Sequence, residues 1–182
     1  MRVLGLSGSL RNGSYNTALL RAAGRFFPPP AHLEIYAELA AVPPYSEDLD
    51  LDRTHPAVER LRHAIASSDA LLIATPEYNA SIPGQLKNAL DWASRPFPNN
   101  VLRRKPVAVI GASTGLFGAV WAQAELRKVL TTLGATVVEA ELLVPAAHTA
   151  FTDDGRLRDP GLAAALQTIV DELRHQPATR AA

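Results

Sequence analysis

The residues that could do chemistry are concentrated near the N-terminus, in a loop between an apolar run and a helical pattern. The apolar run, residues 3–6, has the composition of a strand buried on both faces. The helical pattern begins near Leu19. The loop between them contains Ser7, Gly8, Ser9, Arg11, Asn12, Gly13, Ser14 and Asn16. Such a loop favours anions, because the free amides and the positive dipole end of the following helix point into it.

The spacing of the loop glycines narrows the choice of anion. It does not match the G-x-G-x-x-G pattern of dinucleotide sites. Gly8 and Gly13 have the Walker A spacing, but Ser14 and Tyr15 stand where that motif needs Lys and Ser/Thr, which disfavours a triphosphate. The segment GLSGS around Ser7 lacks the second glycine of the nucleophile elbow G-x-S-x-G, which disfavours acyl transfer. A monophosphate suits the loop best, and an ordinary tight turn is the alternative.

Composition excludes several classes of protein. The chain has 182 residues, enough for one domain with a sizeable core. Its 18 basic and 18 acidic residues balance, which favours neither nucleic acid nor an anionic membrane as a partner. The absence of cysteine excludes disulfides, thiolate catalysis and Cys-ligated metals. With no apolar run of about 18 residues and no signal-peptide pattern, we expect a cytoplasmic protein.

Strand-like and helix-like segments alternate along the chain. After the first strand, strands are predicted over residues 33–36, 70–74, 107–110 and 137–143. Alternation of this kind implies right-handed βαβ units and a parallel sheet covered by helices on both faces. We predict an α/β, flavodoxin-like three-layer sandwich with a five-stranded parallel sheet of order 2-1-3-4-5. A single domain is expected over residues 1–182, with a frayed tail over 175–182.

An acidic segment and the histidines offer weaker candidates. Glu47, Asp48, Asp50 and Asp52 are expected to form a solvated loop rather than a metal site. The five histidines are scattered, so a hydrolase is disfavoured, and for His148 a surface role is expected.

Ligands of a doubly wound sheet bind at the carboxyl ends of its strands, where three of the predicted loops converge. The second of these loops, residues 75–84, is stiffened by two prolines and carries Tyr78. The third loop, residues 113–118, combines small residues with Phe117. A phosphate at the first loop and a flat ring between the other two describe a mononucleotide with a large base, and FMN fits best.

At these motifs the chain resembles the NADPH-dependent FMN reductases, which include bacterial quinone and chromate reductases. The resemblance rests on SGSLRNGSYN, on PEYNASIPGQLKNALDW and on the loop before AQAELRKVL, and it covers about residues 1–143. It implies FMN and NADPH or NADH as cofactors. Hydride would pass from NAD(P)H to FMN and then, in a ping-pong cycle, to a small electron acceptor such as a quinone, a flavin, an azo or nitro compound, or a metal oxyanion.

The resemblance also implies roles for individual residues. The first motif would hold the FMN phosphate through Ser9, Arg11, Ser14, Tyr15, Asn16 and Thr17. The second would lie along the isoalloxazine through Pro76, Glu77, Tyr78, Asn79, Ser81 and Ile82. The third would contribute Ser113, Thr114, Gly115 and Phe117. No catalytic side chain and no metal ligand is predicted. For Glu77 a salt bridge or helix cap is the alternative, and for Tyr78 a half-buried loop position.

Two further expectations follow from the family. Relatives assemble as homodimers or homotetramers, partly through the helix that holds Asn88 and Trp92, whereas a core position for Trp92 is the alternative. The third loop departs from the family at Ala119 and Trp121, where many relatives have Gly and Arg. An FMN electron carrier of the flavodoxin type and a flavin-binding module without enzymatic activity are the rival functions.

Overall fold

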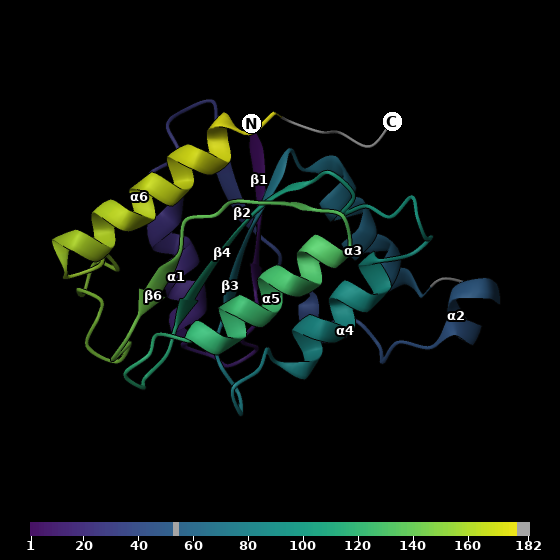
Figure 1. Cartoon of the computed structure of the whole chain (residues 1–182), viewed down its shortest axis with the longest axis horizontal. Coiled ribbons are helices and arrows are strands. Elements are labelled where there is room, and N and C mark those ends of the chain that lie inside the picture. Colours follow the sequence, from purple (N-terminus) through teal and green to yellow (C-terminus); the bar gives the residue numbers. More distant parts are fainter. Residues whose placement is uncertain (53–54, 178–182) are drawn as a thin grey trace.

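A parallel sheet runs through the middle of the molecule (Figure 1). The computed structural model describes residues 1–52 and 55–177. The sheet has the order β2-β1-β3-β4-β5, and a sixth strand, β6, also pairs with β4. Its strands are β1 (Arg2–Ser7), β2 (His32–Ile35), β3 (Ala70–Thr75), β4 (Pro106–Ala112), β5 (Thr136–Val137) and β6 (Leu142–Val144). All the strand pairs are parallel, which confirms the predicted class and strand order.

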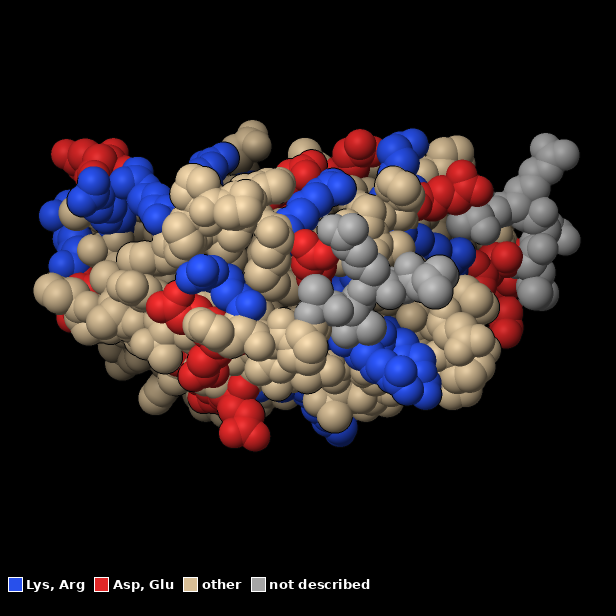
Figure 2. Space-filling model, turned by 90° about the horizontal axis from the view of Figure 1, so that it is seen from above, with Lys and Arg blue, Asp and Glu red and all other residues tan. Residues whose placement is uncertain are grey.

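Helices cover both faces of the sheet. They are α1 (Tyr15–Gly24), α2 (Glu47–Asp52), α3 (Pro56–Ser67), α4 (Gly84–Ala93), α5 (Val120–Thr132) and α6 (Pro160–His175), with a short 3₁₀ turn at Leu39–Ala41. Alternate residues of β3 separate the two layers. Leu71 and Ile73 pack with α3, α4 and α5, whereas Leu72 packs with α1 and α6. On the face that Figure 2 shows, acidic and basic side chains are interspersed.

The predicted fifth strand is divided in two, which corrects the expected single strand over residues 137–143. The guanidinium of Arg127 donates hydrogen bonds to the carbonyl oxygens of Val138 and Ala140, and it also reaches that of Val109 on β4. These oxygens are therefore taken by a side chain rather than by a strand ladder. Burial lowers the pKa of Arg127, and the nearby Glu141 carboxylate opposes this shift.

Three other segments refine the sequence analysis. The acidic segment is not a plain loop, because it forms α2, and the Asp50 carboxylate pairs with Arg62 at 2.7 Å. Helix α6 includes His175, the first residue of the predicted frayed tail, and residues 178–182 of that tail lie outside the described residues. Trp92 is fully buried, and its Nε1–H donates to the Pro43 carbonyl at 2.8 Å. Among the described residues, no helix is long and apolar enough to cross a membrane.

Candidate functional site

The loops after β1, β3 and β4 meet around one cavity at the carboxyl edge of the sheet. Its volume is about 230 Å³. It is lined by Ser9, Arg11, Ser14, Tyr15, Asn16, Pro76, Glu77, Tyr78, Ala112, Ser113 and Thr114. All but Ala112 belong to the set of residues predicted from the sequence. The convergence of three separate loops on one cavity makes it the candidate site.

The first loop presents the N-terminus of α1 to this cavity. Ser14 is the N-cap of the helix, and its Oγ accepts a hydrogen bond of 3.2 Å from the Thr17 N–H. Thr17 does not line the cavity; its hydroxyl donates to Ser7 Oγ at 2.8 Å, and Ser7 in turn donates to the Ser9 carbonyl. Thr17 thus stabilises the conformation of the first loop. The other first-turn amides of α1, those of Tyr15 and Asn16, have no partner within the helix and suit an anion.

Arg11 is held at the exposed rim of the first loop. Its Nη2 donates to the Gly13 carbonyl at 3.2 Å, and its guanidinium lies 5.2 Å from the centre of the Tyr15 ring. The Tyr15 ring stacks in parallel on Phe151, with 6.4 Å between the ring centres. Contacts on both sides of Tyr15 therefore keep a positive charge beside the helix N-terminus. A second hollow of about 490 Å³ shares Ser9, Arg11 and Ser14 with this cavity and adds Arg21.

The side chain of Asn16 joins the first loop to the third. It is almost completely buried, and its amide donates to the Ala112 carbonyl at 2.9 Å and accepts from the Ala112 N–H at 3.0 Å. The sequence analysis predicts Asn16 as a cofactor-binding residue. It does line the cavity, but its side-chain hydrogen bonds are used to hold α1 against the end of β4.

The second loop folds into a tight turn. Tyr78 and Ser81 exchange two backbone hydrogen bonds of 3.0 and 3.1 Å, and the residues between them, Asn79 and Ala80, both have positive φ. The turn leaves half of the Tyr78 side chain exposed at the cavity, so the ring is free to contact a ligand. Asn79, Ser81 and Ile82 do not line the cavity, and the Ile82 side chain is buried in the core.

Two carboxylates tie the second loop to α5. Glu77 Oε2 accepts hydrogen bonds from the N–H groups of Trp121 and Ala122, at 3.0 and 3.1 Å, and so caps the helix. Glu125 Oε2, within α5, accepts a longer bond of 3.4 Å from the Ile82 N–H. The helix-cap alternative for Glu77 is the one that the structure shows, although the residue also lines the cavity.

The third loop passes close to β6 and needs an unusual backbone. Gly118 has a φ of 56°, and a Cβ at this position would lie 2.7 Å from backbone atoms of Leu143 and Val144. Ala119, which follows it and was singled out in the sequence analysis, also adopts positive φ, at 65°. Two consecutive residues of the third loop therefore adopt positive φ, and the second of them is not a glycine.

Two aromatic side chains of this region stand outside the cavity. Phe117 and Trp121 are both at least half exposed, and their rings meet edge to face with centres 5.1 Å apart. Gly115 also lies outside the cavity lining; its N–H binds Ser113 Oγ at 3.1 Å.

Sequence reasoning missed Gln123, which fixes the third loop from below. Gln123 is fully buried, and its Nε2 donates to the carbonyls of Gly118 and Leu142 at 3.1 and 2.9 Å. It lies in the motif AQAELRKVL, but a single glutamine in a helical pattern gives no signal of such a role.

Comparison with known proteins identifies the family to which the chain is similar. The sequence matches the family described as NADPH-dependent FMN reductase over residues 1–149. It is 48% identical over 160 residues to an NAD(P)H-dependent FMN reductase of Pseudomonas aeruginosa, covering 87% of this chain and 85% of the relative. It is 37% identical over 174 residues to a 2-hydroxy-1,4-benzoquinone reductase of a Burkholderia species, covering 94% and 93%.

A solved structure agrees with these sequence matches. The flavoenzyme NAD(P)H:(acceptor) oxidoreductase FerB of Paracoccus denitrificans superposes with a TM-score of 0.86 at 35% identity, over 97% of this chain and 98% of that one. These findings confirm the predicted family, the oxidoreductase class, and FMN and NAD(P)H as its cofactors. The chain belongs to the NADPH-dependent FMN reductase family.

Proposed function

We propose that the cavity between the three loops holds FMN and that the protein uses NAD(P)H to reduce a quinone in a ping-pong cycle. The observation that carries the proposal is the single cavity, which has a helix N-terminus with Arg11 at one part of its wall and Tyr78 at another. The helix N-terminus with Arg11 suits a phosphate, and Tyr78 suits a flat ring; FMN contains both groups.

The side chains present fit FMN. Ser9, Ser14 and Arg11, with the first-turn amides of α1, would hold the phosphate, because hydroxyl, amide and guanidinium groups are all hydrogen-bond donors. Residues 76–78 and 113–114 would flank the ring. When bound, FMN supplies the chemistry of accepting and returning a hydride.

The protein's own role would be to bind FMN, to orient its ring and to leave the ring accessible to the substrates. The cavity lining contains a single carboxylate residue, Glu77, whose Oε2 caps α5, and no histidine, so we assign no general acid or base. Backbone N–H groups of the second loop would stabilise negative charge at the ring edge. Because one open cavity serves both NAD(P)H and the acceptor, the two would bind in turn, and ping-pong kinetics follow.

A quinone is favoured as the acceptor by the relatives and by the site. Several relatives are named quinone reductases, among them one from Escherichia coli at 39% identity. The half-exposed ring of Tyr78 offers a face to a flat, apolar acceptor. The predicted homodimer or homotetramer and the cytoplasmic location stay proposals that rest on the family resemblance.

The test is the visible spectrum of the purified protein, recorded before and after NADPH is added without oxygen. A yellow protein that bleaches with NADPH and regains its colour with benzoquinone supports the proposal. A yellow protein that NADPH does not bleach would be an electron carrier instead. A colourless protein that takes up no added FMN would overturn the proposal. Parallel lines in double-reciprocal plots at several quinone concentrations would support the ping-pong cycle, and intersecting lines would contradict it.

A further inference from the structure

A separate cavity lies at the far end of α1 from the first loop, between that helix, α6 and the hairpin formed by residues 151–157. Its volume is about 420 Å³, within the roughly 300–1,000 Å³ typical of small-molecule sites. It is lined by Ala22, Arg25, Phe26, Arg156, Leu157, Ala163 and Leu166. It shares no residue with the FMN cavity, so a ligand here would not compete for that site.

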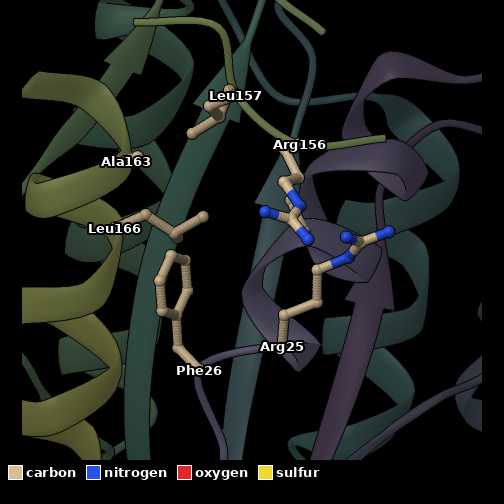
Figure 3. A pocket seen from close by; sticks show the side chains of 7 residues that line it. Arg25, Phe26, Arg156, Leu157, Ala163 and Leu166 are labelled. Carbon is tan, nitrogen blue, oxygen red and sulfur yellow. The ribbon is translucent and has the colours of Figure 1, made fainter. Parts of the chain in front are cut away.

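The cavity has an apolar floor. Leu166 of α6 is fully buried and Leu157 of the hairpin is 9% exposed, and the ring of Phe26 lies beside the Leu166 side chain in Figure 3. Ala163, one turn before Leu166 on α6, leaves space because its side chain is small. These carbon surfaces suit the apolar part of a ligand.

The mouth of the cavity is cationic. Arg25 follows the end of α1 and Arg156 comes from the hairpin, and their guanidinium groups approach one another in Figure 3. One carboxylate, that of Asp154, pairs with both, at 3.7 Å from Arg25 and 2.9 Å from Arg156. These three side chains therefore carry a net positive charge.

Arg156 also has free hydrogen-bonding capacity. Its Nε lies 2.9 Å from a carboxylate oxygen of Asp154, and its two terminal nitrogens make no hydrogen bond within residues 1–52 and 55–177. Its side chain is 70% exposed, so the group can turn toward a ligand without losing a buried contact. A carboxylate would complete this fork and relieve the repulsion between the two guanidinium groups.

We propose that this cavity binds a small amphipathic carboxylate, an acid with an aliphatic body such as a medium-chain fatty acid. The carboxylate would lie between Arg25 and Arg156, and the aliphatic body would cover Phe26 and Leu166. Charge complementarity selects an anion over a neutral lipid, and the apolar floor selects an acid with a hydrocarbon body over a small inorganic anion. The proposal does not depend on the reaction proposed for the FMN site.

The test is calorimetric titration of the FMN-loaded protein with octanoate, and with 1-octanol as the neutral comparator. Octanoate should bind at one saturable site and octanol much more weakly. Arg156→Gln should lower the affinity for octanoate about fivefold, since exposed charge pairs contribute up to about 1 kcal/mol. Ala163→Phe should abolish binding by filling the floor. Arg158→Gln removes an exposed arginine of the same segment that does not line the cavity, and it should change nothing.

Three outcomes would overturn the proposal. The first is no saturable binding of octanoate in the millimolar range. The second is binding that Arg156→Gln and Ala163→Phe both leave unchanged, which would place the acid elsewhere. The third is a dimer, seen by light scattering, that Ala163→Phe dissociates while octanoate does not bind. A second copy of the chain would then cover this cavity.

Discussion

The Glu77 carboxylate accepts a hydrogen bond of 3.0 Å from the backbone N–H of Trp121, so a side chain of the second loop caps the helix that follows the third loop. The neighbouring N–H, that of Ala122, donates to the same oxygen. Because both loops line the candidate site, this contact sets the spacing of the two walls proposed to flank the flavin ring.

Removing this cap should loosen the site and the helix together. Glu77→Ala leaves two helix N–H groups without their acceptor and should lower the free energy of unfolding by about 1 kcal/mol. FMN affinity should fall as well, because the two walls are no longer tied. Thermal unfolding and fluorescence titration with FMN measure both effects. Glu139→Ala, at an exposed glutamate, is the matched control, and equal behaviour of the two variants would show that the cap is unimportant.

Arg11 provides the sharpest test of the phosphate assignment. Charge-assisted hydrogen bonds contribute about 1.5–3 kcal/mol, and because Arg11 is exposed its contribution should be near the lower end of this range. Arg11→Ala should therefore lower the affinity for FMN roughly tenfold. Riboflavin, which lacks the phosphate, should bind the parent and the variant equally well. If riboflavin loses as much affinity as FMN, Arg11 acts on the loop and not on the phosphate.

The sequence predicted the strand order of the sheet and the three loops that meet around the candidate cavity, while the binding role of that cavity stays a prediction. The apolar run ALLIA marks β3 because both faces of that strand are buried, and a doubly wound sheet brings the ends of its strands together. Sequence could not show how side chains would be used. The amide of Asn16 is bonded to a residue 96 positions away, and Ile82 points into the core.

The divided fifth strand was also beyond sequence reasoning. Residues 137–143 have the composition of one continuous strand, and the division depends on Arg127, which comes from a helix earlier in the chain. Periodicity describes a segment by itself and carries no information on such a distant donor. The single domain over residues 1–182 stays a prediction.

Gly118 should be intolerant of a side chain. Its φ is positive, and an added Cβ would lie 2.7 Å from the backbone of β6, so Gly118→Ala should cost at least about 2 kcal/mol of stability. Gly84→Ala is the control, since a Cβ there meets nothing within 4 Å and removing a glycine stabilises by about 0.4–1 kcal/mol. Urea unfolding of both variants measures the contrast, and a neutral Gly118→Ala would show that the third loop can move away from β6.

Tyr36 should make stability depend on pH in alkaline solution. Burial raises the pKa of its hydroxyl above the usual 10.0, as does the Glu38 carboxylate, while Arg60 opposes them. Because the pKa of Tyr36 is raised in the folded state, its contribution to the free energy of unfolding is complete below pH 10. This contribution is lost as the pH rises through the folded-state pKa. The hydroxyl oxygen is also buried and has no hydrogen-bond partner among the described residues.

Tyr36→Phe should therefore be neutral or stabilising at neutral pH, and it should flatten the alkaline loss of stability. Thermal unfolding at about pH 8 and about pH 11 gives both comparisons. Tyr45→Phe provides the contrast, because the Tyr45 hydroxyl accepts a hydrogen bond of 2.9 Å from Arg95 Nε and its removal should destabilise. A Tyr36→Phe protein as unstable as Tyr45→Phe would show that the Tyr36 hydroxyl has a partner in solution.

The two hydrogen bonds between Asn16 and Ala112 join the start of α1 to the end of β4 through protein atoms alone. With the Glu77 cap, they join all three loops into one framework. A cofactor that enters such a framework loses little free energy to ordering of the protein. Hydrogen exchange at the amides of Ala112 and Trp121 should therefore be slow in the apoprotein, and FMN should retard it only slightly further.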